Sequence, residues 1–172
     1  MKKIIFLFIT LSFFLISEAQ ITNKIMGLTL GATTEFQVKT FLKNKHYKIT
    51  EQHDDCFFCN GLDFKFGGYQ WTGLSFFFFE KKLMSIGISS YEFYYPKETF
   101  DNLVASLKDK YSPFFINEEL SDPNNKWSLF SDGKTSLRVY YVKGKYNATH
   151  IGISYTNVSL AEKSVIRDKN EL

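Results

Sequence analysis

The sequence is poor in the residues that mark several specialised kinds of chain. It has only 10 glycines and 3 prolines among 172 residues, which excludes a collagen-like repeat. Its 21 basic and 18 acidic residues give a formal charge of +3, without the clustered basic residues typical of nucleic-acid binding. With 44% hydrophobic and 23% charged residues, the composition is that of a globular protein and excludes a disordered or multi-span membrane chain.

Long apolar runs are also scarce. The sequence has one such run, near its start, and that run is short. The run from Ile4 to Ile16 follows Lys2-Lys3 and precedes Ser17-Glu18-Ala19, the layout of a secretory signal peptide with a cleavage site. A membrane-spanning helix needs roughly 20 apolar residues, more than this run provides. The sequence therefore predicts a signal peptide over 1–19, a mature chain from Gln20, and no stable membrane anchor after cleavage. The protein is expected in the bacterial periplasm or secreted.

A second destination stays open. The final residues Lys169-Asn170-Glu171-Leu172 resemble the retention signal of the endoplasmic reticulum, and the sequence has glycosylation sequons at Asn147 and Asn157. These features permit residence in the lumen of the endoplasmic reticulum, whereas the short Lys-Lys leader favours a bacterial exported protein.

Motifs that carry catalysis or bind cofactors are missing. The sequence has no Gly-x-Ser-x-Gly elbow, no His-Glu-x-x-His zinc motif, no phosphate-binding glycine loop and no dinucleotide fingerprint. None of the three histidines, His46, His53 and His150, has a neighbouring serine or cysteine in an activating pattern. We therefore predict no catalytic residue and no cofactor, although a catalytic triad can be assembled from distant positions.

Two short sequences occur twice at the same spacing. Leu42-Lys43-Asn44-Lys45 is similar to Leu107-Lys108-Asp109-Lys110, and Ile86-Gly87-Ile88-Ser89 is identical to Ile151-Gly152-Ile153-Ser154. Both pairs are 65 residues apart, which favours a diverged tandem repeat.

Each copy of this repeat is expected to contain one helix followed by three strands. The helices are indicated by apolar stripes before His46 and before Pro113, and the strands by alternating apolar residues. The expected strands are Leu62 to Phe66, Tyr69 to Phe79, Leu83 to Tyr91, Lys126 to Phe130, Ser136 to Val142 and His150 to Thr156. The predicted class is α+β: two tandem αβββ repeats, about 25–92 and 96–157, form an antiparallel sheet backed by helices on one face. They make one domain over 20–157, and residues 158–172 form a helix-prone tail.

The opening of the first copy resembles a known group of exported modules. Ile25-Met26-Gly27-Leu28-Thr29-Leu30-Gly31 leads through Thr33-Thr34 into the first helix, and strands follow. This resembles the β-lactamase inhibitor protein and the assembly lipoprotein of the outer-membrane β-barrel machinery. The resemblance implies a non-enzymatic module whose sheet face engages another protein, and it transfers no site residue.

The two cysteines, Cys56 and Cys59, are close in sequence and lie in an expected loop. In an exported chain the simplest interpretation is a local disulfide. Alternatives are free or intermolecular thiols, a redox pair, or a metal site with His53, Asp54 or Asp55 and a distant histidine. The last two give the alternative function, a small exported enzyme or a metal or redox protein centred on this loop.

Aromatic residues are abundant, with 19 Phe, 10 Tyr and 2 Trp. On the strand from Tyr69 to Phe79, period-two alternation puts Leu74, Phe76 and Phe78 on one face and more aromatics on the other. Helices on one side of the sheet would cover one face only. Either the second face is covered by another segment, or it is exposed and binds a partner.

We predict the second alternative, an exported non-enzymatic binding module that engages a protein or other envelope partner through this aromatic face. Aromatic and arginine side chains of this kind are typical of interface hot spots. The predicted binding residues are Tyr69, Trp71, Phe77, Phe79, Arg138, Tyr140 and His150, with no metal ligand.

Overall fold

The computed structural model describes residues 20–90, 96–122, 125–143 and 149–170. The expected signal peptide, 1–19, and the last two residues of the chain lie outside these ranges.

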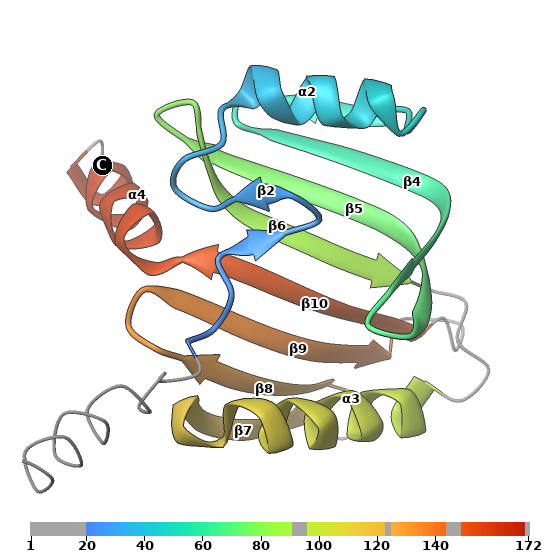
Figure 1. The fold of residues 1–172 in the computed structure, drawn as a ribbon. Coiled ribbons are helices and arrows are strands. Elements are labelled where there is room, and N and C mark those ends of the chain that lie inside the picture. Colours follow the sequence, from blue (N-terminus) through green and yellow to red (C-terminus); the bar gives the residue numbers. More distant parts are fainter. Residues whose placement is uncertain (1–19, 91–95, 123–124, 144–148, 171–172) are drawn as a thin grey trace, which may run out of the picture.

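An eight-stranded antiparallel sheet runs through the molecule, and its strands lie in the order β3-β4-β5-β6-β10-β9-β8-β7 (Figure 1). Strands β3 to β6 come from the first half of the chain and β7 to β10 from the second, so the halves meet where β6 pairs with β10. The predicted α+β class and antiparallel sheet are confirmed. The strands are β3 (Glu51–His53), β4 (Cys56–Phe66), β5 (Tyr69–Phe79), β6 (Lys82–Ser90), β7 (Phe115–Asp122), β8 (Asn125–Ser131), β9 (Thr135–Lys143) and β10 (Thr149–Asn157).

In each half a helix precedes four strands of the large sheet, one strand more than predicted. The helices are α2 (Glu35–Asn44) and α3 (Pro96–Tyr111), and each carries its apolar stripe into the core. The missed strands, β3 and β7, are the two edges of the sheet. Strand β3 has three residues, all exposed, so it lacks the apolar alternation on which sequence recognition depends.

Strand β4 begins at Cys56, six residues before the predicted start at Leu62. Asn60-Gly61 was expected to belong to a loop but lies within the strand. The β4–β5 pairing shifts register between Asn60 and Phe64, and Gly61 has φ +69°. This is a β-bulge, where glycine is favoured because residues with a side chain are strained at positive φ. The strand continues through a position that in sequence resembles a turn.

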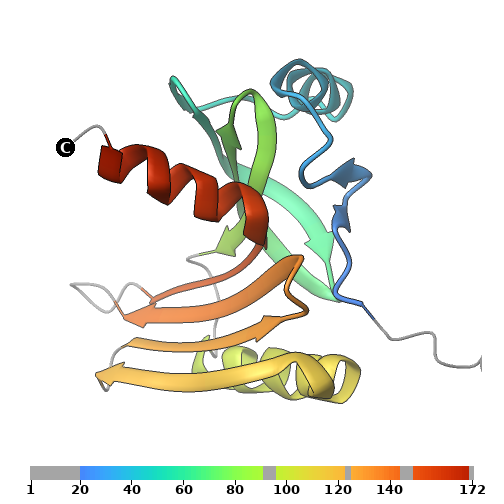
Figure 2. The same ribbon diagram turned by 90° about the vertical axis from the view of Figure 1, so that its left-hand side faces the viewer.

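The helices divide the sheet into a covered face and an open one. Helix α2, helix α3 and the small hairpin of β1 (Lys24–Ile25) and β2 (Leu28–Thr29) cover one side, which we call the inner face (Figures 1 and 2). Helix α4 (Val158–Asn170) lies on the opposite side, which we call the outer face (Figure 2). The expected helix-prone tail is therefore a helix, and not every helix backs the same face.

The core fills the space between the inner face and its cover. Leu74, Phe76 and Phe78 are at most 5% exposed, as their alternation on β5 predicts. Ile86 and Ile88 on β6 and Ile151 and Ile153 on β10 extend the same buried layer across the centre of the sheet.

The two halves pair their last strands in matching registers. Ser75 on β5 lies opposite Gly87 on β6, and 65 residues later Tyr140 on β9 lies opposite Gly152 on β10. Where β6 meets β10, Ile88 lies opposite Ile153, which is again 65 residues away. The centre of the sheet therefore has a local twofold arrangement about the Ile88–Ile153 pair.

The start of the described chain is fastened to the second half by Asp132. Its Oδ2 accepts a 3.0 Å hydrogen bond from the N–H of the buried Ile21, and its Oδ1 accepts from the N–H groups of Lys134 and Thr135. We expect Asp132→Ala to lower the free energy of unfolding by about 1–3 kcal/mol, because a buried N–H loses its acceptor. Urea denaturation measures this loss. Asp132→Asn keeps one carbonyl acceptor and should lose less; equal stability of all three proteins would contradict the assignment.

Candidate functional site

The outer face has a floor of very small side chains at its centre. Because side chains alternate along a strand, the two Ile-Gly-Ile-Ser sequences send their isoleucines into the core and their other residues outward. Gly87 and Ser89 on β6 and Gly152 and Ser154 on β10 thus lie side by side on the outer face. The repeated motif therefore builds both the middle of the core and the floor of the open face.

This floor belongs to a hollow of about 460 Å³, within the size range of small-molecule sites. Its lining comes from β3, β4, β5, β6, β9 and β10 and is mainly aromatic and hydroxyl-bearing. The lining residues are Glu51, Phe58, Asn60, Leu74, Ser75, Phe77, Ser85, Gly87, Ser89, Tyr140, His150 and Ser154.

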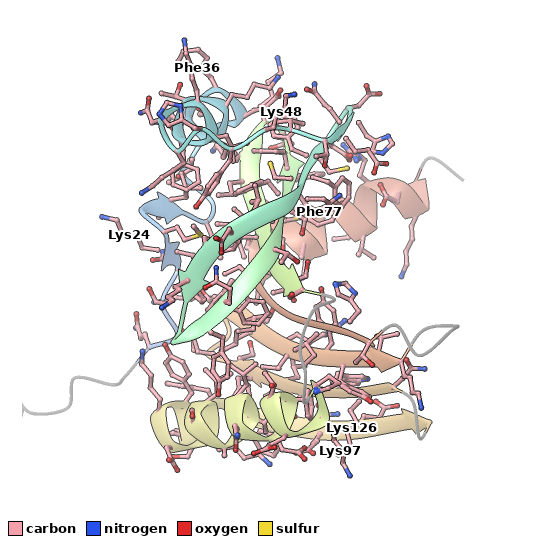
Figure 3. The ribbon with its side chains drawn as sticks, turned by 90° about the vertical axis from the view of Figure 1, so that its right-hand side faces the viewer. Lys24, Phe36, Lys48, Phe77, Lys97 and Lys126 are labelled. Carbon is pink, nitrogen blue, oxygen red and sulfur yellow. The ribbon has the colours of Figure 1, made fainter. Side chains whose placement is uncertain are left out.

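Two pairs of rings form the walls of the hollow. On one side Phe58 and Phe77 meet edge to face, with centroids 5.8 Å apart and an interplanar angle of 89°. On the other, Tyr140 and His150 meet at 5.4 Å and 75°. In Figure 3, Phe77 points to the side of the sheet on which α4 lies, away from Lys24. The hollow is therefore bounded by aromatic edges and floored by serine and glycine.

The hollow carries little charge. Among the described residues that line it, Glu51 is the one with a formal charge, and its Oε1 lies 2.6 Å from Nε2 of His53. Burial lowers the pKa of His150 below its usual value, because the surrounding protein disfavours the charged imidazolium. No described lysine or arginine lines the hollow, so it offers no cation to an anionic group.

The aromatic surface continues beyond the hollow toward β8. Arg138 on β9 is exposed, and its guanidinium carbon lies 5.3 Å from the ring centroid of Trp127 on β8. Stacking of this kind holds an arginine in place without removing it from solvent.

The structure brings together some of the predicted binding residues and buries others. Phe77, Tyr140 and His150 line the hollow, and Arg138 lies beside them on the outer face. Tyr69 is half-buried against the core.

For Trp71 and Phe79, the expectation of an exposed position is wrong. Trp71 is 0% exposed, because this end of the β4–β5 hairpin packs into the core together with Phe64, the residue opposite Trp71; its Nε1–H donates to the carbonyl of Phe66 at 2.8 Å. Phe79 is 5% exposed, and the guanidinium carbon of Arg167 on α4 lies 5.0 Å from the centroid of its ring.

Sequence reasoning missed Phe58, Asn60 and the serines of the floor. Phe58 falls in the loop expected around Cys56 and Cys59, whereas alternation along the observed strand Cys56–Phe66 places it on the face of Phe77. The serines are neither aromatic nor charged, so they did not stand out as binding residues. The feature that could have identified two of them is the repeated Ile-Gly-Ile-Ser sequence.

The predicted disulfide between Cys56 and Cys59 is wrong, since both are free cysteines on β4. Residues three apart on an extended strand point to opposite faces and are too distant for a disulfide. Cys56 lies opposite Phe77 on the outer side, whereas Cys59 is fully buried in the core opposite Leu74.

The same geometry separates the residues of the alternative site, His53, Cys56 and Cys59. Cys59 faces the core while His53 is exposed on β3, and across the described ranges no cluster of three histidine, cysteine or acidic residues is arranged to hold a metal ion. Burial, with Asp55 and Glu51 nearby, raises the pKa of Cys56, and burial raises the pKa of Cys59 to about 11. Raised thiol pKa values oppose redox activity at this pair.

Comparison with protein-family models, with curated proteins and with solved structures finds no match to this chain. The resemblance to the exported inhibitor and assembly lipoprotein thus remains an expectation. Within the part of the chain that the structure describes, no helix has both the length and the apolar character to cross a membrane.

Both cysteines are expected to be reduced and unreactive in the folded protein. Cys56 is 8% exposed and Cys59 is 0% exposed, and their raised pKa values leave little thiolate at pH 8. Iodoacetamide should modify neither thiol in the native protein and both after unfolding without reductant. A mass two daltons low, or resistance to alkylation after unfolding, would indicate a disulfide instead.

Stability is expected to fall at mildly acidic pH through His150. Its folded pKa lies below its usual value of about 6.5, so the unfolded chain binds the proton more readily. The free energy of unfolding should be unaffected by this group above about pH 6.5 and should decrease as pH falls through the lowered folded pKa. Urea denaturation of wild type and His150→Gln from pH 5 to 8 isolates the effect, since the variant should lose stability less steeply below pH 6.5.

Proposed function

We propose that this protein is an exported, non-enzymatic binding module that engages a protein partner through the outer face of its sheet. The observation that carries the proposal is the aromatic-walled hollow on the outer face, which neither α2, α3 nor the β1–β2 hairpin covers. Proteins seldom leave clustered aromatic side chains open to solvent without an interaction that uses them.

The extent of this surface favours a protein partner over a small molecule. Aromatic side chains occur from Phe58 on β4 to Trp127 on β8, across six neighbouring strands. With about 4.8 Å between strands, they span roughly 24 Å, which is wider than a single small ligand. Tyrosine, tryptophan and arginine are the residues most enriched in interface hot spots, and Tyr140, Trp127 and Arg138 adjoin here.

We also infer that the two halves arose by duplication. The 65-residue offset of the repeated sequences recurs in the strand pairing, since Ser75–Gly87 and Tyr140–Gly152 are equivalent pairs and Ile88 lies opposite its own counterpart, Ile153. Each unit is then a helix and four strands. This arrangement supports the resemblance to tandem exported inhibitors, and export itself rests on the proposed signal peptide over 1–19.

Partner capture by mature protein, residues 20–172, tests the proposal. The bait is incubated with envelope and culture fractions, and the partner's affinity for each variant is then measured. Tyr140→Ala and Phe77→Ala should each weaken binding at least tenfold, as expected when an interface aromatic is truncated.

Phe36→Ala is the matched control. Phe36 is 78% exposed on α2, on the other side of the molecule, so its loss should leave binding unchanged while removing a similar apolar side chain (Figure 3). A partner that is lost with Phe36→Ala and retained with Tyr140→Ala and Phe77→Ala would overturn the proposal.

A further inference from the structure

Tyr140 lies across a glycine on the neighbouring strand. A Cβ built on Gly152 would collide with Cζ and Oη of Tyr140, so the phenol ring occupies the space above this glycine. The ring also meets His150 edge to face at 5.4 Å. In the second half of the sheet, therefore, the outer surface of β10 is covered by the protein's own tyrosine.

The first half repeats this arrangement without the ring. Gly87 is equivalent to Gly152, and the residue opposite it is Ser75 where the second half has Tyr140. A Cβ on Gly87 would collide with Oγ of Ser75, so the Ser75 side chain lies over Gly87 as the Tyr140 side chain lies over Gly152. The serine side chain is shorter and has no ring beyond its hydroxyl. The hollow lies over this serine–glycine pair, at the position where the second half holds a phenol ring.

The surroundings of this position suit an aromatic ring that carries a hydroxyl group. Phe77, with Phe58 against it, supplies an apolar wall. Ser75, Ser89 and Ser154 supply side-chain hydroxyls for which the structure gives no hydrogen-bond partner among the described residues. These hydroxyls can donate to or accept from a phenol oxygen, whereas the hollow has no cation for a carboxylate or phosphate.

We propose that the hollow binds a tyrosine side chain of the partner, with its ring laid over Gly87 as the ring of Tyr140 lies over Gly152. This inference rests on the proposed function, because it names the group of the partner that enters the outer face. The duplicated sheet would then present two equivalent ring positions, one filled by its own chain and one filled on binding.

A single-residue probe tests the inference without the partner. We would titrate ¹⁵N-labelled protein, residues 20–172, with N-acetyl-tyrosinamide and follow the backbone amides of Gly87 and Gly152. Affinity should be millimolar, as for other fragments of this size. The amide of Gly87 should shift through the ring current and that of Gly152 should not, because Tyr140 already covers it. N-acetyl-leucinamide should shift Gly87 at least threefold less.

Ser75→Tyr is the decisive variant. It places a ring over Gly87 in the way Tyr140 is placed over Gly152. It should abolish the response of Gly87 to the probe and weaken binding of the captured partner. Ser75→Ala is the matched control, since it leaves the space open and removes one hydroxyl, so it should weaken probe binding threefold at most. Circular dichroism and thermal melting establish that each variant is folded.

If Ser75→Tyr does not fold, Tyr140→Ser makes the reciprocal test. It should open a second position, so that the amide of Gly152 now responds to N-acetyl-tyrosinamide. The inference is overturned if Gly87 does not respond in the wild type, if the leucine probe acts equally, or if folded Ser75→Tyr still binds the probe. A partner that requires Tyr140 and Phe77 while the probe fails to bind would overturn this inference and leave the proposed function standing.

Discussion

The pairing of β6 with β10 is the interaction on which the rest of the structure depends. Six residue pairs, from Ile151–Ser90 to Thr156–Ser85, join the last strand of one half to the last strand of the other. Without it, each half would be a four-stranded sheet with a largely buried strand, β6 or β10, left unpaired at an edge, a state prone to aggregation. With it, the isoleucines of both Ile-Gly-Ile-Ser sequences close one core and their glycines and serines form one floor.

This central pairing also explains why the outer face can be open. Small residues at its middle leave little apolar area in water, so the sheet does not need a second layer of helices there. The larger rings lie at the margins of the hollow and pack edge to face in pairs, Phe58 with Phe77 and Tyr140 with His150. Helix α4 covers another large side chain, Phe79, through Arg167.

Local patterns predicted much of this architecture. The apolar stripes of α2 and α3 and the alternation of Leu74, Phe76 and Phe78 depend on residues near one another in sequence. The errors came from positions where a distant contact decides. Asn60-Gly61 is typical of a turn, yet pairing with β5 makes it a bulge within a continuous strand, so Cys56, Phe58 and Cys59 lie on a strand and not in a loop.

By itself, the sequence determined the α+β class, the helices and most of the strands, because apolar periodicity and turn residues act over a few positions. It also identified Phe77, Tyr140, Arg138 and His150 as neighbours on one face, since alternation along a strand sets the face of each side chain. Only the tertiary structure decided which aromatics remain open and which are buried, because burial depends on strand order, on register shifts and on where α4 packs. The hollow over Gly87 likewise exists only once six separate strands are brought side by side in register.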